Sequence, residues 1–180
     1  MFKYFSIISI TLILMTSCTG KTTENQPTNM PEQTSEPQVQ EHQKTSEVNY
    51  ADVTFITLDS KEVKLGDYKG KRILLNLWAT WCGPCIKEMP SLNRAYNILK
   101  EENYVFLVAS NEKIKKIKGF ADNTEFDFPI VKADDMFRPF SVQVIPTTII
   151  FDTAGNLETT ITGGREWDEE SVLKQLRAVK

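Results

Sequence analysis

The alternation of hydrophobic and polar positions from residue 50 to the C-terminus predicts short strands and amphipathic helices. Runs rich in β-branched and aromatic residues, each bounded by turn residues, are typical of strands. They lie at residues 53–58, 62–65, 73–79, 104–109, 128–131, 147–151 and 157–162. Asp59 and Ser60 separate the first two runs and predict a hairpin. The uninterrupted apolar run 73–79 indicates a central strand covered on both faces.

Helix-like spacing of apolar residues separates several of these runs. After Gly83 and Pro84, apolar side chains recur every three or four positions and predict a helix that Pro90 kinks. Its inward positions are Ile86, Met89, Leu92, Tyr96 and Leu99. Asn111 is expected to cap a second helix, and residues 134–141 to form a helical turn or two.

The second and last helices have clear inward and outward faces. The second places Ile114, Ile117 and Phe120 inward and Lys113, Lys115, Lys116 and Lys118 outward. We interpret this lysine run as a solvated face and not as a ligand site. Asp168 is expected to cap the last helix, which buries Val172, Leu173, Leu176 and Val179.

The predicted order of elements is β-β, then β-α-β-α, then β-β-α. Strands that alternate with helices and end in a hairpin favour an α/β fold of three layers, with helices on both faces of one sheet. Residues 50–180 suffice for one such domain.

The first 17 residues predict an export signal. One lysine precedes an apolar run that is too short to span a membrane, which takes about 20 residues. Thr16, Ser17 and Cys18 follow, and the segment resembles a bacterial lipoprotein signal, in which such a cysteine becomes the lipidated first residue. The alternative is an ordinary cleaved signal that contains a cysteine. Both readings export the protein, and the first anchors it to a membrane through Cys18.

Residues 18–49 are expected to form a tether between this anchor and the domain. From residue 19 the composition shifts to Thr, Gln, Glu, Pro and Asn, with few large apolar side chains. Such a segment cannot bury enough surface to offset the entropy lost on ordering, so the sequence predicts disorder here. The single histidine, His42, lies in this segment.

Charge and composition exclude several function classes. The chain of 180 residues has 21 Lys and Arg against 24 Asp and Glu, with a pI of about 5.3, so nucleic acid is not an expected partner. Without a histidine in the domain, neither a histidine metal cluster nor a Ser/His or Cys/His catalytic pair is available. No cofactor or metal is expected.

The candidate chemistry lies in the segment Trp81-Cys82-Gly83-Pro84-Cys85, at the junction of a buried strand and a helix. Two thiols on one first helical turn can close a disulfide with little rearrangement. Cys82 faces the unpaired N–H groups and positive dipole end of the helix, which favour its thiolate and make it the expected nucleophile. Cys85 lies one turn inward, where it can resolve a mixed disulfide. Pro84 suits the first turn because no helical partner is needed there.

This motif, followed by Val144-Ile145-Pro146-Thr147-Thr148, resembles the thioredoxin superfamily. The wider frame around both motifs, over residues 50–180, resembles its TlpA/ResA-like branch of membrane-tethered thiol-disulfide oxidoreductases. The resemblance implies a thioredoxin-like fold with an added N-terminal hairpin. It also implies a cis Pro146 packed beside the disulfide, and an Ile145 whose main chain binds an extended substrate.

Glu88, three residues after Cys85, matches an acidic position near the disulfide of the ResA-like group. Thioredoxin itself has a buried Asp where this chain has Asn76, which cannot exchange a proton. A carboxylate one turn from Cys85 can move the proton that thiol-disulfide exchange requires, so we predict that Glu88 does so. The alternative is a solvated surface glutamate.

Other side chains near the motif allow two interpretations each. Trp81 is expected to border the substrate groove and Trp78 to lie in the core, although Trp81 could also serve packing alone. Ile145 could simply fill space. The Cys82/Cys85 pair could be an inert structural disulfide, but such a bridge normally closes a longer loop.

The resulting hypothesis is an enzyme of the cell envelope that reduces disulfides of exported proteins and receives electrons from a membrane donor of thiol type. The branch suggests apocytochrome c as a substrate. Two alternatives are a copper chaperone, which would require a core histidine and a wider cysteine spacing, and a thiol peroxidase. The peroxidase would require Thr and Pro where this chain has Ala79 and Leu75.

Overall fold

The computed structural model describes residues 49–135 and 137–180. The predicted signal, Cys18, His42 and the tether up to residue 48 lie outside these described residues. The first element, the 3-10 helix η1 (Tyr50–Asp52), begins where the domain is expected to begin, and the side chain of Asn49 caps it. No helix in the described part of the chain is both long and apolar enough to cross a membrane.

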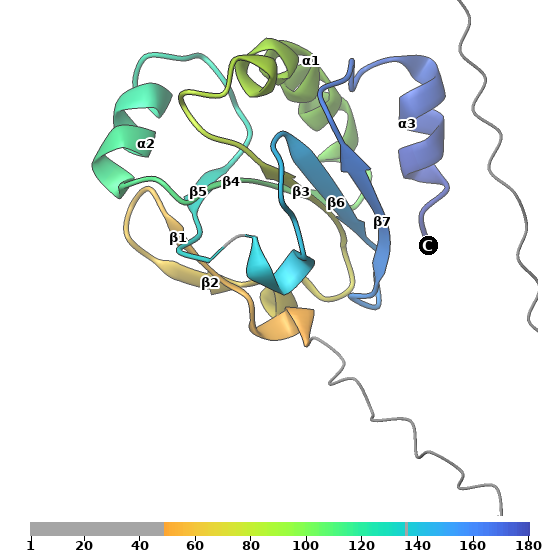
Figure 1. The fold of residues 1–180 in the computed structure, drawn as a ribbon. Coiled ribbons are helices and arrows are strands. Elements are labelled where there is room, and N and C mark those ends of the chain that lie inside the picture. The colour runs from red at the N-terminus through yellow and green to blue at the C-terminus, as the bar shows by residue number, and fades with distance from the viewer. Residues whose placement is uncertain (1–48, 136) are drawn as a thin grey trace, which may run out of the picture. The chain divides into compact units, whose positions relative to one another are not determined.

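The strands form one mixed sheet in the order β2-β1-β5-β4-β3-β6-β7 (Figure 1). Their bounds are β1 (Thr54–Thr57), β2 (Glu62–Lys64), β3 (Arg72–Leu77), β4 (Tyr104–Ser110), β5 (Ile130–Lys132), β6 (Thr147–Phe151) and β7 (Leu157–Thr162). β3 is central and pairs parallel to β4 and antiparallel to β6. The predicted hairpin of β1 and β2 is confirmed, and it joins the sheet through β5.

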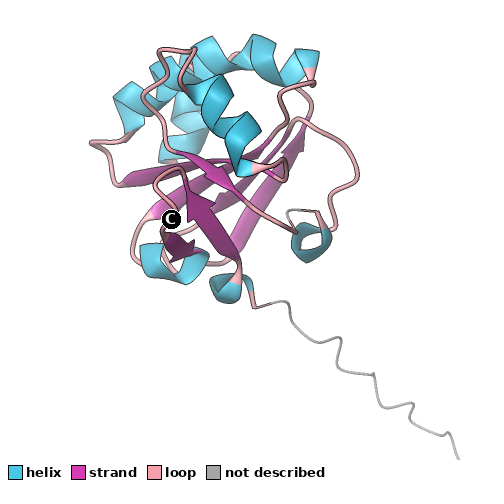
Figure 2. Ribbon diagram, turned by 90° about the vertical axis from the view of Figure 1, so that its left-hand side faces the viewer, coloured by secondary structure: helices cyan, strands magenta, loops and turns pink. Residues whose placement is uncertain are grey.

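Helices cover both faces of the sheet but differ in kind (Figure 2). The α-helices are α1 (Gly83–Leu99), α2 (Ile114–Ala121) and α3 (Glu170–Arg177). All three pack against one face. The opposite face is covered by η1 and by two further 3-10 helices, η2 (Leu65–Tyr68) and η3 (Arg138–Phe140). The predicted three-layer thioredoxin-like α/β fold is confirmed, with short 3-10 turns as its second helical layer.

Successive residues of β3 and β4 divide the core into two clusters. Leu74 and Val108 face the α-helices, whereas Leu75 and Leu107 face the 3-10 helices. This alternation follows from the two-residue period of a strand. The central strand is therefore fixed from both faces, as its apolar run predicts.

Two predicted helix caps are wrong. The residue before α2 is Lys113, not Asn111, because β4 continues to Ser110 and Asn111 lies too early to reach the helix. The residue before α3 is Glu169, because the carboxylate of Asp168 instead binds Arg94 of α1 at 2.6 Å.

Smaller differences concern the ends of elements. The strand expected at 128–131 begins at Ile130, since Pro129 has no N–H to donate to a sheet. Among the described residues of the segment 134–141, those that are helical are Arg138–Phe140. Val179 is half-buried at the edge of the core and not fully enclosed.

Candidate active site

The cysteine pair lies where the central strand passes into α1. β3 ends at Leu77, and Cys82 occupies the N-cap of α1, with Pro84 in the first turn. Cys82 and Cys85 form a disulfide with a Cα–Cα distance of 5.3 Å. The main-chain N–H of Cys85 donates to Cys82 Sγ at 3.3 Å, so one unpaired N–H of the helix start points at this sulfur.

Exposure separates the side chains of this loop. Cys85 is fully buried and Cys82 is 4% exposed, so Cys82 is the more exposed residue of the two by a small margin. Trp81 is 70% exposed, whereas Trp78 is fully buried. Trp78 is therefore a core residue, as expected, and Trp81 presents a large apolar surface directly before Cys82.

A close approach of three segments brings Pro146 beside the helix start. The Ile145–Pro146 peptide bond is cis, as the family resemblance implies. The main-chain N–H of Gly163 donates to the carbonyl oxygen of Pro146 at 2.8 Å. A Cβ at Gly164 would lie 3.3 Å from the Pro84 carbonyl oxygen and 3.8 Å from Pro146 Cγ, so only a glycine fits here without a shift. Ile145 is half-buried and packs against both core clusters.

Glu88 is buried, not solvated: its residue is 3% exposed. Asn76 Nδ2 donates to Glu88 Oε1 at 2.9 Å, and Trp167 Nε1 donates to Oε2 at 2.9 Å. The main-chain N–H of Arg165 donates to Oε2 at 3.2 Å. Burial raises the pKa of Glu88 above its ordinary value, and the three donors partly oppose this shift. The interpretation of Glu88 as a surface residue is therefore wrong.

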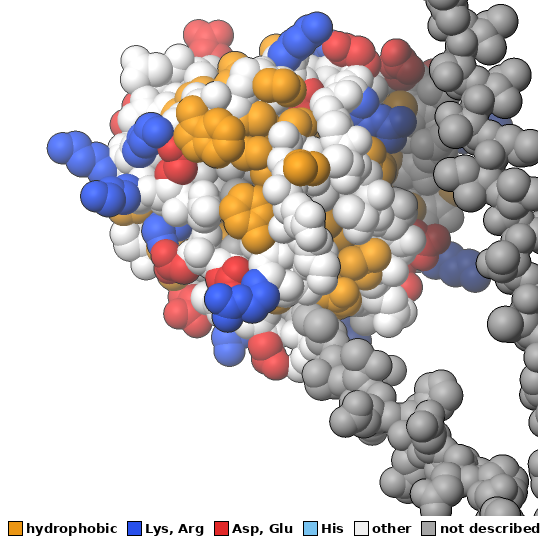
Figure 3. All heavy atoms as spheres, in the orientation of Figure 1, with side chains coloured by type: hydrophobic (Ala, Val, Ile, Leu, Met, Phe, Trp, Pro, Cys, Tyr) orange, Lys and Arg blue, Asp and Glu red, His pale blue; other side chains and the backbone are white. Residues whose placement is uncertain are grey.

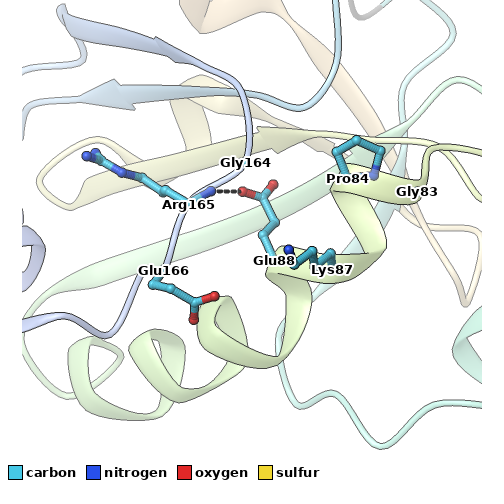
Figure 4. A pocket seen from close by; sticks show the side chains of 7 residues that line it. All are labelled: Gly83, Pro84, Lys87, Glu88, Gly164, Arg165 and Glu166. Atoms are coloured by element: carbon cyan, nitrogen blue, oxygen red, sulfur yellow. Dashed lines mark hydrogen bonds between the residues drawn. The ribbon is translucent and has the colours of Figure 1, made fainter.

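A pocket of about 510 Å³ opens between the first two turns of α1 and the loop after β7 (Figure 4). It is lined by Gly83, Pro84, Lys87 and Glu88 of α1 and by Gly164, Arg165 and Glu166 of the loop after β7. Because Gly83 and Pro84 separate the two cysteines, the pocket adjoins the redox motif. Glu88 therefore reaches a space next to the cysteines while its carboxylate is held by buried donors.

Sequence reasoning missed two residues of this region. Glu112 accepts hydrogen bonds from the main-chain N–H of Thr80 at 2.6 Å and from its hydroxyl at 3.0 Å. Its position two residues after the end of β4 was a usable signal, because parallel neighbouring strands end at one edge of a sheet. Trp167 had no such signal, since nothing in the local sequence relates it to Glu88.

The described residues offer no evident metal site. Within 49–135 and 137–180, no three His, Cys, Asp or Glu side chains gather closely enough to hold an ion. The lysines of α2 are exposed, and Lys116 pairs with Glu112 at 2.5 Å. They form a solvated face, as expected.

These features define a class: a thioredoxin-like domain with a Cys-x-x-Cys pair at a helix start and a cis proline before the next strand. The family model described as Redoxin matches residues 37–176, and the chain belongs to this family. The thiol-disulfide oxidoreductase ResA of Geobacillus kaustophilus (strain HTA426) is 33% identical over 132 residues, which cover 72% of this chain and 75% of that protein.

Two further comparisons agree. The thioredoxin-like protein YneN of Bacillus subtilis (strain 168) is 33% identical over 116 residues, covering 62% of this chain and 68% of that protein. The crystal structure of the exposed lipoprotein thioredoxin Etrx1 from Streptococcus pneumoniae strain TIGR4 matches with a TM-score of 0.64 at 25% identity. It covers 72% of this chain and 100% of Etrx1. The resemblance to the ResA-like branch is confirmed, and the chain is a thiol-disulfide oxidoreductase of this type.

Proposed function

We propose that this protein is a membrane-anchored, extracytoplasmic reductase that transfers two electrons from Cys82 and Cys85 to disulfides of exported proteins. The observation that carries the proposal is the Cys82–Cys85 disulfide at the start of α1, with the buried Glu88 carboxylate one turn further on. A disulfide that closes so short a loop adds little to stability, which favours a redox role over a structural one.

The reaction begins with the reduced pair. The Cys82 thiolate, favoured by the N-terminal end of α1, attacks one sulfur of the substrate disulfide. The substrate S–S bond breaks, its leaving sulfur takes a proton, and a mixed disulfide with Cys82 forms. The Cys85 thiolate then attacks Cys82 Sγ and releases the second substrate sulfur, which also takes a proton. The substrate gains two electrons and two protons, and the Cys82–Cys85 disulfide remains.

Glu88 supplies the proton transfer within this sequence. Its carboxylate accepts the proton of the Cys85 thiol before the second attack and returns it to the released substrate thiolate. The raised pKa of Glu88, caused by burial, brings its proton affinity closer to that of a thiol, which makes transfer in both directions easier.

Five residues, two of them joined by a cis peptide bond, shape the surface that meets the substrate. Trp81 contributes exposed apolar area next to Cys82. Ile145, before the cis Pro146, offers main-chain groups to an extended substrate segment, and Pro146 packs beside the disulfide loop. Gly83 and Pro84 hold the cysteines in the first turn of α1.

The proposed anchor lies in the first 49 residues. Residues 1–17 act as a lipoprotein signal, Cys18 carries the lipid, and residues 18–49 tether the domain of residues 50–180 to the membrane. The similarity to Etrx1, which is itself described as an exposed lipoprotein, supports this arrangement. The Cys18→Ser substitution is expected to move the protein from the membrane fraction to the soluble fraction of the cell envelope.

The proposed partners are disulfide-containing exported proteins, with apocytochrome c as the first candidate, and a membrane donor of thiol type that reduces Cys82 and Cys85 again. An oxidising compartment would otherwise leave the pair as a disulfide after one turnover. A reduction potential in the range of thioredoxin is expected. A potential as high as that of DsbA, about −120 mV, would reverse the direction of transfer.

A Cys85→Ser variant tests the central claim. Without the resolving sulfur, mixed disulfides between Cys82 and substrates are expected to accumulate in envelope extracts and to disappear on treatment with a reductant. The matched control is the double variant Cys82→Ser, Cys85→Ser, which is expected to trap nothing. Equal trapping by both variants, or none by Cys85→Ser, would contradict the proposed mechanism.

A further inference from the structure

The Glu88 carboxylate is held by nitrogen donors from two separate parts of the chain outside α1. β3 supplies the Asn76 amide, and the loop between β7 and α3 supplies the Trp167 indole and the Arg165 main chain. Figure 4 shows the Glu88 side chain pointing from α1 toward the loop that carries Arg165. All three contacts present N–H groups, and such an arrangement stabilises a carboxylate relative to a carboxylic acid.

Trp167 and Glu88 depend on each other. Trp167 is fully buried, and its indole nitrogen can only donate, so it needs an acceptor inside the protein. That acceptor is Glu88 Oε2 at 2.9 Å. A negatively charged acceptor makes a stronger bond with an N–H than a neutral acid does, so the contact favours the ionised carboxylate.

Ser91 fixes the indole relative to α1. The main-chain N–H of Trp167 donates to Ser91 Oγ at 3.1 Å, and Ser91 Oγ donates to the carbonyl oxygen of Glu88 at 2.8 Å. Ser91 also contacts the carbonyl oxygen of Arg165 at 3.3 Å. The loop is thus fastened to the helix one turn beyond Glu88, and the indole N–H keeps its direction toward the carboxylate.

Within the described part of the chain, few other charged or titratable groups lie around Glu88. Lys87 and Cys85 are its neighbours on α1, and Arg165 and Glu166 line the same pocket from the loop. β3 and β6 contribute the uncharged Asn76 and Thr148, which also bond to each other at 2.9 Å. Burial therefore opposes the charge of Glu88, while the Trp167 and Arg165 contacts and the neutral amide of Asn76 support it.

We infer that Trp167 is a positioning residue for the exchange reaction: its indole N–H holds Glu88 as a charged, proton-accepting carboxylate at the pocket beside the disulfide. The inference rests on the proposed role of Glu88 in the function given above. In that role Cys85 passes its proton to Glu88, the thiolate attacks Cys82 Sγ, and the released substrate sulfur takes the proton. Without the indole N–H, Glu88 stays protonated up to a higher pH, and a protonated Glu88 cannot accept the proton of Cys85.

The test is a Trp167→Phe variant of the full-length protein, which keeps an aromatic ring and removes the N–H. We measure the single-turnover rate of disulfide reduction by the reduced protein across pH. In the parent the rate is expected to rise with pH as Glu88 ionises. In the variant this rise is expected to move to higher pH, with a rate roughly tenfold lower on the acid side of the rise and restored on its alkaline side. An unchanged pH profile would overturn the inference.

Trp78→Phe is the matched control. Trp78 is also fully buried, but its indole N–H donates to the carbonyl oxygen of Val108, at 3.3 Å, and not to Glu88. Both variants lose a buried indole donor and some stability. Only Trp167→Phe is expected to displace the pH profile, and an equal displacement in Trp78→Phe would show a general effect of destabilisation and refute the inference.

A second measurement starts from the unsubstituted protein. In the unsubstituted protein, the NMR resonance of the Trp167 indole proton is expected to shift with pH at the same midpoint as the Glu88 carboxyl carbon. In Glu88→Gln both titrations should vanish. An indole resonance that does not shift at the Glu88 midpoint overturns the inference.

The Glu88→Gln variant also separates the inference from the proposed function. If Glu88→Gln leaves the rate and the pH profile unchanged, the proposed function of Glu88 fails. A strong Glu88→Gln effect without a Trp167→Phe effect refutes the inference alone.

Discussion

At the scale of single residues, Glu88 shows how burial and hydrogen bonding oppose each other. Removal from water disfavours its charge and raises its pKa, while Asn76, Trp167 and the main chain of Arg165 partly compensate. Asn76 also has an oxygen, Oδ1, that is buried without a hydrogen-bond partner in the described part of the chain. If the Asn76 amide turned over, this oxygen would face position 88 and accept a hydrogen bond from a protonated Glu88 or from an amide there.

Glu88→Gln is expected to change how stability depends on pH. The folded-state pKa of Glu88 lies above its ordinary value of 4.5, so its favourable contribution is complete below that value and is lost as pH rises through the folded pKa. The Gln variant does not titrate, and its amide can donate to the turned Asn76. As the pH rises through the folded-state pKa of Glu88, the melting temperature of the parent should therefore fall relative to that of the variant. Parallel curves would contradict the raised pKa.

At the scale of elements, the loop between β3 and α1 is held from β4. Thr80, two residues before Cys82, is bound through its main chain and its hydroxyl by Glu112, which follows β4. Burial opposes ionisation of Glu112, but hydrogen bonds from Lys116 and Thr80 hold its pKa below its ordinary value. The Glu112 carboxylate, just after β4, thus holds the loop that leads from β3 into the cysteine motif.

Glu112→Ala is expected to lower the free energy of unfolding at neutral pH by about 1–3 kcal/mol, since the N–H of Thr80 loses its partner. Because the folded-state pKa of Glu112 is lowered, its contribution is present above the ordinary value of 4.5 and is lost as pH falls through the folded pKa. Denaturant unfolding of parent and variant should therefore converge in acid.

Lys116→Ala is the control for this prediction. It removes only the half-exposed partner of Glu112, and pairs of that kind contribute roughly 0.2–1 kcal/mol. An equal loss in both variants would show that the ion pair, and not the grip on Thr80, accounts for the effect.

At the scale of the whole molecule, one sheet serves two cores. β3 and β4 contribute alternate residues to the cluster under the α-helices and to the cluster under the 3-10 helices. Figure 3 shows apolar side chains emerging in places on the face of the domain seen in Figure 1, between charged groups of both signs. Because the strands are shared, damage to either core is expected to weaken the active-site face as well.

Leu107→Ala tests this coupling from the face that lacks the cysteines. Leu107 is buried among the 3-10 helices, so its truncation is expected to cost about 2–5 kcal/mol. Native-state hydrogen exchange should show protection falling in α1 as well as in β4. The control Ile98→Ala, at a partly exposed position of α1, should change stability by less than about 0.5 kcal/mol. Loss of protection confined to the 3-10 face would contradict a shared cooperative unit.

The sequence by itself determined the strands, the long first helix and the place of the cysteine pair, because strand and helix periods and the Cys-Gly-Pro-Cys turn are local signals. It misplaced both helix caps. Asn111 lies too early in the chain to reach α2, and the carboxylate of Asp168 binds Arg94 of another element. Only the tertiary structure decided that Glu88 is buried and which groups hold it. Trp167 lies 79 residues from Glu88, and Glu112 lies 32 from Thr80. The Trp167 contact also requires β6 to pair with β3 and β7 with β6, a topology that no local pattern encodes.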